Sequence, residues 1–168
     1  MIKISYPIMG DYAIPTKYLL SHVLKNEIVN PPSISARTIE LGSKYSPEFV
    51  CTPFKYTLGT MIETILMGAN VLVQFGGGCR YGYYGEVQGQ ILNDLGYNVK
   101  VISLVTRGKT SIRRIIKEMK KVNLRFSKIK ALYYLFITLK MVKYMDLIDD
   151  YIRENIGFEC EEGSFESL

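Results

Sequence analysis

The sequence predicts an α/β fold, with a parallel sheet of about four strands, flanking helices and long C-terminal helices. Short apolar runs alternate with runs of helical spacing, a glycine-rich turn separates one such strand from the next helix, and only helical spacing follows residue 110. This alternation is typical of βαβ units, whose strands pair in parallel through right-handed crossovers. We therefore expect a cysteine-bearing α/β domain over 1–106 and a helical extension over 107–168, packed on that domain or on a partner.

The N-terminal part alternates strand and helix. The first expected strand covers residues 2–7, an apolar and β-prone run that ends before a glycine. The helix after it carries Pro15 in its first turn, where proline is tolerated, and has an apolar stripe at helical spacing. A short strand and a proline-rich loop over 30–35 come next, and a second helix over 36–44 is expected to close at Gly42.

The third expected helix starts beside a cysteine. Thr52 is a suitable N-cap, Pro53 suits the first helical position, and Gly68 ends the helix. Cys51 therefore lies immediately before a helix N-terminus.

The next strand leads into the glycine-rich turn. It covers 69–75 and stops at three glycines in GGGCRYGYYG, after which a helix over 86–95 and a strand over 98–104 complete a βαβ unit. In a parallel sheet, ligands bind beyond the carboxyl ends of the strands, where loops and helix N-termini converge. The turn after 69–75 is therefore the expected place for a site.

The turn itself contains residues suited to ligand binding. Gly76, Gly77 and Gly78 allow positive φ and a close approach of the backbone to a ligand. Main-chain amides of the following helix can bind an anion or sulfide, and the positive charge of Arg80 favours the thiolate of a nearby cysteine. Cys79 is thus predicted to be a ligand or nucleophile, with a small buried residue of a tight turn as the alternative.

The two loop cysteines are best considered together. Cys51 and Cys79 stand 28 positions apart (79 − 51), and if the strands before them are neighbours, both thiols face one crevice. This spacing differs from the C-x-x-C pairs of zinc ribbons and suits a cluster held between elements. Cys160 lies in an acidic segment and is expected to be structural or incidental.

Charge is distributed unevenly. Residues 1–106 carry 8 basic and 7 acidic side chains, residues 107–143 carry 12 and 1, and residues 144–168 carry 1 and 8. Because the acidic block can neutralise much of the basic block, nucleic-acid binding is not expected. No secretory signal or membrane-length apolar run is found, so we expect a cytoplasmic protein that does not bind membranes.

Other chemical motifs are weaker. Residues 107–110 end in Gly-Lys-Thr but lack the earlier glycine of a phosphate-binding loop, so ATP binding is expected of a partner instead. The glycine turn also lacks the register of a dinucleotide-binding loop. His22 is expected to have a surface or core role on its helix, while Tyr81 and Tyr83 line a pocket or pack the start of a helix.

The residues around both cysteines resemble the 2-hydroxyacyl-CoA dehydratase family and its relatives, the CoA-substrate-specific enzyme activases. The resemblance lies in Cys51-Thr52-Pro53, Lys55, Leu58-Gly59 and the run CRYGYY from Cys79 to Tyr84. The tail from Tyr151 is also similar to a later stretch of the activase relatives, so the resemblance covers most of the chain.

The resemblance implies a flavodoxin-like or Rossmann-like domain that holds an iron–sulfur cluster, [4Fe–4S] or related, with Cys51 and Cys79 as ligands. It implies low-potential electron transfer linked to acyl-CoA dehydration, a lyase reaction, with the electron supplied by an ATP-dependent activator protein. It further implies a third cysteine ligand from another domain or a partner subunit, so that this chain alone holds an incomplete set. The alternative is a truncated, non-catalytic interaction domain whose long helices pair with another subunit.

Overall fold

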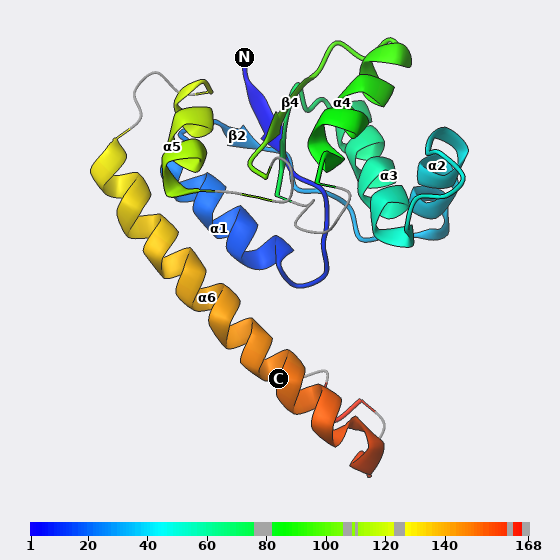
Figure 1. The fold of residues 1–168 in the computed structure, drawn as a ribbon, viewed down its shortest axis with the longest axis vertical. Coiled ribbons are helices and arrows are strands. Elements are labelled where there is room, and N and C mark those ends of the chain that lie inside the picture. Colours follow the sequence, from blue (N-terminus) through cyan, green and yellow to red (C-terminus); the bar gives the residue numbers. More distant parts are fainter. Residues whose placement is uncertain (76–81, 106–108, 110, 123–126, 161–162, 166–168) are drawn as a thin grey trace.

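The computed structural model describes residues 1–75, 82–105, 109, 111–122, 127–160 and 163–165. Its centre is a four-stranded, all-parallel sheet in the order β2-β1-β3-β4, which confirms the expected α/β class (Figure 1). The strands are β1 (Lys3–Ser5), β2 (Glu27–Ile28), β3 (Val71–Gln74) and β4 (Lys100–Ser103).

Helices cover both faces of the sheet. They are α1 (Ala13–Val23), α2 (Ala36–Tyr45), α3 (Thr52–Leu66), α4 (Tyr84–Asp94), α5 (Ile112–Lys120) and α6 (Lys128–Asn155), followed by the short 3₁₀ helix η1 (Ile156–Phe158). Helices α1, α5 and α6 lie on one face, and α3 and α4 lie on the other with α2 outside α3 (Figure 1). Because both faces are covered, every residue of β3 is buried.

Alternate residues of β3 supply two separate cores. Val71 and Val73 pack with α1, α5 and α6, whereas Leu72 packs with α3 and α4. This is the two-residue period of a strand between two helical layers. By the same alternation, Phe75 packs against the α1 side, while Gln74 contacts α4 on the other side.

The strand order creates a switch point. The chain goes from β1 to β2 through α1 on one face, and then from β2 to β3 and from β3 to β4 through α3 and α4 on the other face. The carboxyl ends of β1 and β3 are therefore the place where the direction of winding reverses, the position at which open α/β sheets bind ligands.

The expected role of Gly42 as the residue that ends the second helix was wrong. Helix α2 continues past Gly42 to Tyr45, and Gly42 lies inside it against α3. A Cβ atom at Gly42 would come within 1.8 Å of the carbonyl oxygen of Lys55, and one at Gly59 within 2.0 Å of the carbonyl oxygen of Thr38. These two glycines allow α2 and α3 to pack backbone to backbone, so Gly42 is retained for packing and not for ending the helix.

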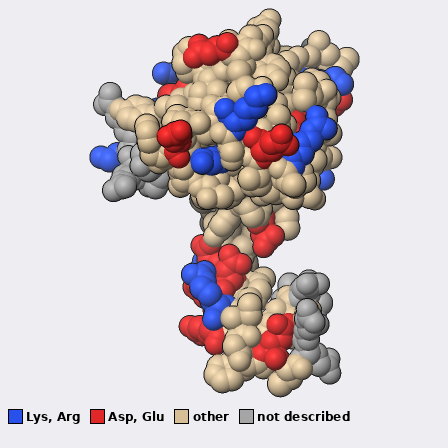
Figure 2. Space-filling model, turned by 90° about the vertical axis from the view of Figure 1, so that its right-hand side faces the viewer, with Lys and Arg blue, Asp and Glu red and all other residues tan. Residues whose placement is uncertain are grey.

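Helix α6 is far longer than the domain requires. Its 28 residues extend about 42 Å at 1.5 Å per residue. Its first half packs on α1 through Ala131, Leu135 and Thr138, and its second half projects beyond the α/β domain (Figures 1 and 2). Within the described residues, no helix combines the length and the apolar character needed to cross a membrane.

Candidate functional site

Cys51 is the N-cap of α3, one residue earlier than the expected cap Thr52. Its carbonyl oxygen accepts the first helical hydrogen bonds, from the main-chain nitrogens of Phe54 and Lys55 at 3.0 and 3.4 Å. Pro53 follows in the first turn, where its missing N–H costs nothing. The half-buried thiol makes no capping bond to its own helix, so it is available to groups from elsewhere in the fold.

The thiol of Cys51 contacts the start of α4. Its Sγ atom lies 2.7 Å from the phenolic oxygen of Tyr84, the first residue of that helix. The ring of Tyr84 is buried and packs edge to face on Phe54, with 5.1 Å between the ring centroids. The N-termini of α3 and α4 are therefore joined at Cys51, beside the carboxyl edge of the sheet.

A buried amide network lies beneath this contact. The Gln74 side chain at the end of β3 donates to Gln88 of α4 at 2.6 Å, and the Gln88 amide donates to the carbonyl oxygen of Phe54 at 3.1 Å and to Thr57 Oγ1 at 2.8 Å. Both glutamines are fully buried. The network ties β3, α4 and the first turn of α3 together, which fixes where Cys51 can lie. In the sequence, the only indication of this network is Gln74, an amide residue at the end of an apolar strand.

The two cysteine loops do not follow neighbouring strands, contrary to the condition set from the sequence. The strand before Cys51 is β2 at the edge of the sheet, and β1 separates it from β3. Cys51 nevertheless reaches the start of α4, because the chain between β2 and β3 crosses the face on which α4 lies. The thiol of Cys51 is therefore positioned by the start of a helix and not by the end of a strand.

Several predicted site residues lie outside the described residues. They are Gly76, Gly77, Gly78, Cys79, Arg80 and Tyr81, and also Arg107, Gly108 and Thr110 of the Gly-Lys-Thr sequence. In the sequence, the segment with Cys79 joins Phe75, next to β3, to Gly82, two residues before α4. Its two ends are thus attached to the same elements that the amide network connects.

The structure also describes three other residues considered in the sequence analysis, Tyr83, His22 and Cys160. Tyr83 is exposed at the start of α4. His22 lies on α1 with its ring between Tyr18 and Tyr134, at centroid distances of 4.2 and 4.7 Å, in keeping with the expected structural role. Cys160 is exposed beyond the far end of α6, with its Sγ atom 3.5 Å from the carbonyl oxygen of Phe158.

The electrostatic surroundings of Cys51 act on a second tyrosine. Burial, and secondarily the negative charge of Cys51, raise the pKa of Tyr56 on α3. The Tyr56 phenol therefore keeps its proton well above neutral pH.

Among the described residues, no group of three or more His, Cys, Asp or Glu side chains could hold a metal ion. Of the two cysteines that the structure describes, Cys51 is the one that lies at the starts of α3 and α4. A sulfur ligand fits there, because the thiol is half-buried and makes no bond to its own helix. The described residues thus bring one candidate sulfur ligand, Cys51, to this edge.

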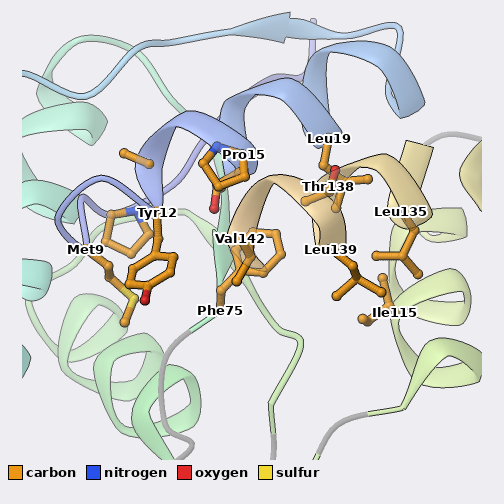
Figure 3. A pocket seen from close by; sticks show the side chains of 13 residues that line it. Met9, Tyr12, Pro15, Leu19, Phe75, Ile115, Leu135, Thr138, Leu139 and Val142 are labelled. Carbon is orange, nitrogen blue, oxygen red and sulfur yellow. The ribbon is translucent and has the colours of Figure 1, made fainter. Parts of the chain in front are cut away.

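A cavity of about 260 Å³ opens on the opposite face of the sheet, between α1 and α6 (Figure 3). Pro7 and Met9 after β1, Phe75 after β3, and Tyr12, Leu139 and Val142 are among the residues that line it. The cavity adjoins the switch point, but the sheet separates it from Cys51, because Phe75 and Gln74 point to opposite faces. Its walls are almost entirely apolar, so they offer little to a charged ligand.

Comparisons of the chain with protein-family models, curated proteins and solved structures each found no match. The family resemblance seen in the sequence therefore stays a prediction, and the chemistry of the site rests on its own residues.

Proposed function

We propose that this chain is an iron–sulfur cluster-binding domain of a protein similar to the 2-hydroxyacyl-CoA dehydratases or their activase relatives, with Cys51 and Cys79 as thiolate ligands. The position of Cys51 carries the proposal: its half-buried thiol lies against Tyr84, the residue that opens α4 directly after the segment with Cys79. The resemblance of CTP and CRYGYY to the family motifs adds the identity of the cluster.

The surroundings of Cys51 suit a sulfur ligand. The positive end of the α3 helix dipole favours an anionic group at this edge. The Tyr84 hydroxyl, 2.7 Å from Sγ, donates a hydrogen bond when the sulfur is a thiolate. Such hydrogen bonds to ligand sulfurs tune the reduction potential of a bound cluster. When bound, the cluster would supply one-electron transfer at low potential.

The amide network keeps this ligand in place. Gln88 holds the Phe54 carbonyl and Thr57 in the first turn of α3, so Cys51 begins from a fixed helix end. Ligands fixed by packing and by buried hydrogen bonds bind without an ordering cost at the moment of binding.

The proposal requires a partner. Cys160 lies beyond the projecting end of α6, so this chain offers two thiolates at most to a cluster at the sheet edge. We assign the remaining ligands to a partner subunit or a further domain, and the supply of the electron to an ATP-dependent activator. The cluster would then lie between two polypeptides or domains, with this chain as one half of its site.

The direct test is anaerobic reconstitution with iron and sulfide, with and without a candidate partner domain, followed by iron analysis per chain. Cys51→Ser and Cys79→Ser should each lose most of the iron, because a serine oxygen is a poor cluster ligand. Cys160→Ser is the matched control and should keep it. A wild-type chain that stays free of iron with every partner tried, or a Cys51→Ser variant that keeps its iron, would disprove the proposal.

A further inference from the structure

The cavity between α1 and α6 is enclosed by side chains from five parts of the fold. Pro7 follows β1, Phe75 follows β3, and Leu19, Ile115 and Leu135 come from α1, α5 and α6 (Figure 3). Because the chain just beyond both central strands contributes to it, the cavity adjoins the place where open α/β sheets bind ligands. A hollow that several elements enclose suits a small molecule better than a flat protein surface.

The walls of this cavity are suited to an uncharged ligand. Among the described residues, 13 side chains line the cavity, and none of them is charged. The hydroxyl of the buried Thr138 donates to the carbonyl oxygen of Tyr134 at 2.8 Å, and the Tyr12 hydroxyl donates to Asp146. A charged or strongly polar ligand would lose hydrogen bonds to water that such walls do not replace. An apolar ligand has no such loss.

The surrounding charge disfavours an anion in particular. The hydrogen bond to Asp146, then burial, and then the charges of Asp146 and Asp149 raise the pKa of Tyr12, whereas the charge of Arg153 lowers it. The guanidinium group of Arg153 pairs with Asp150 at 3.2 Å. Where Tyr12 borders the cavity, the nearby charge is therefore mainly negative, and a carboxylate head group would be repelled.

The dimensions of the cavity indicate the size and shape of the ligand. An apolar cavity of about 150 Å³ holds benzene, a ring of six carbons, so the cavity of about 260 Å³ holds roughly ten carbons by the same ratio. Its walls extend from Tyr12 to Leu19 on α1 and from Leu135 to Val142 on α6. Each span covers seven residue steps (19 − 12 and 142 − 135), or about 10 Å of helix. The space is thus longer than a single ring and fits an extended chain.

We propose that the cavity between α1 and α6 binds the hydrocarbon chain of a ligand without an anionic head group, a chain of roughly ten carbons. The chain lies along α1 and α6, with one end at the carboxyl edge of the sheet. This site lies across the sheet from Cys51, so it does not depend on the proposed cluster.

Titration calorimetry of the full chain with 1-alkanols, from 1-hexanol to 1-dodecanol, tests the size of the site. Each additional CH₂ group that enters the cavity should raise the affinity about four-fold. The increase should stop near ten carbons, when the cavity is full. No saturable binding of any alkanol would overturn the proposal. An increase that continues unchanged to 1-dodecanol would indicate adsorption on exposed apolar surface and would also overturn it.

The same titration with decanoate tests the exclusion of an anionic head group. Decanoate has the same number of carbons as 1-decanol, but no charged side chain among the described wall residues can pair with its carboxylate. Its affinity should be lower than that of 1-decanol by about ten-fold or more. Equal affinities for the two compounds would contradict the proposed ligand class.

A matched pair of variants tests the location. Val142→Phe adds a ring to the cavity wall and should lower the affinity for 1-decanol about ten-fold or more, because the ring occupies space that several CH₂ groups would fill. Val87→Phe makes the same change on α4, across the sheet, where Val87 is 40% exposed, and should bind like the wild type. Circular dichroism checks that both variants fold. Wild-type affinity in a folded Val142→Phe would overturn the proposal, and the alkanol series on the wild type decides it without any variant.

Discussion

Replacing Gln88 by leucine should separate the role of the amide network from that of the thiol. Leucine has a similar volume but cannot accept from Gln74 or donate to the Phe54 carbonyl and Thr57 Oγ1, three hydrogen bonds in a fully buried place. A buried hydrogen bond contributes about 1 kcal/mol net, and a buried polar group that loses its partner costs about 1–3 kcal/mol. Thr57 keeps its bond to the Pro53 carbonyl, which limits the loss. We expect a destabilisation of about 2–4 kcal/mol.

Urea unfolding followed by circular dichroism measures this free energy, and Gln90→Leu on the exposed side of α4 is the control. Gln90 bonds only to Asp94 in the next turn, so its loss should cost less than about 0.5 kcal/mol. The rate at which a thiol reagent modifies Cys51 should also rise in Gln88→Leu, because the start of α3 is held less firmly. Equal unfolding free energies for the Gln88 and Gln90 variants would refute the network as the device that fixes Cys51.

Two further predictions concern the frame around the site. Burial raises the pKa of Tyr6 to about 12, so the folded state holds this proton more tightly than the unfolded chain. This contribution to the free energy of unfolding is fully present below about pH 10 and is lost as the pH rises through about 12. Urea unfolding across this pH range should show a falling free energy of unfolding. In Tyr6→Phe, the fall should be smaller. Gly42→Ala should lower the free energy of unfolding by about 2–4 kcal/mol, because the added Cβ atom would overlap a carbonyl oxygen of α3 at 1.8 Å. Gly157→Ala is the control and should change this free energy little, because a Cβ atom there would have no atom within 4 Å. A similar loss in both variants would contradict the packing explanation.

The elements that local chemistry defines could be predicted from the sequence. The strand before the glycine turn and the helix after Cys51 were both found, because apolar runs, a proline in the first turn and glycine breakers are local signals. Gly42 was misread, because its function lies in contact with Lys55 on another helix. A glycine that ends a helix and one that admits a neighbouring helix look alike in a single sequence.

The surroundings of Cys51 could be predicted only in part for the same reason. A helix start at Cys51 is a local property, but its contact with Tyr84 and the burial of Gln88 depend on how α3 and α4 are packed. Periodicity also could not tell which side of α6 faces the domain, since both sides are apolar. Ala131 and Leu135 pack inward and leave the larger side chains outside.

The surroundings of Cys51 are separate from those of α6. Cys51 and the amide network lie on the face covered by α3 and α4, whereas α6 packs on α1 across the sheet. Phe136 on α6 belongs to neither buried core, so a substitution such as Phe136→Glu changes neither the helix start at Cys51 nor its contact with Tyr84. If the sheet edge binds a cluster, the ligands beyond Cys51 and Cys79 must come from a different polypeptide or domain, because Cys160, the third cysteine of the sequence, lies after η1, beyond the far end of α6.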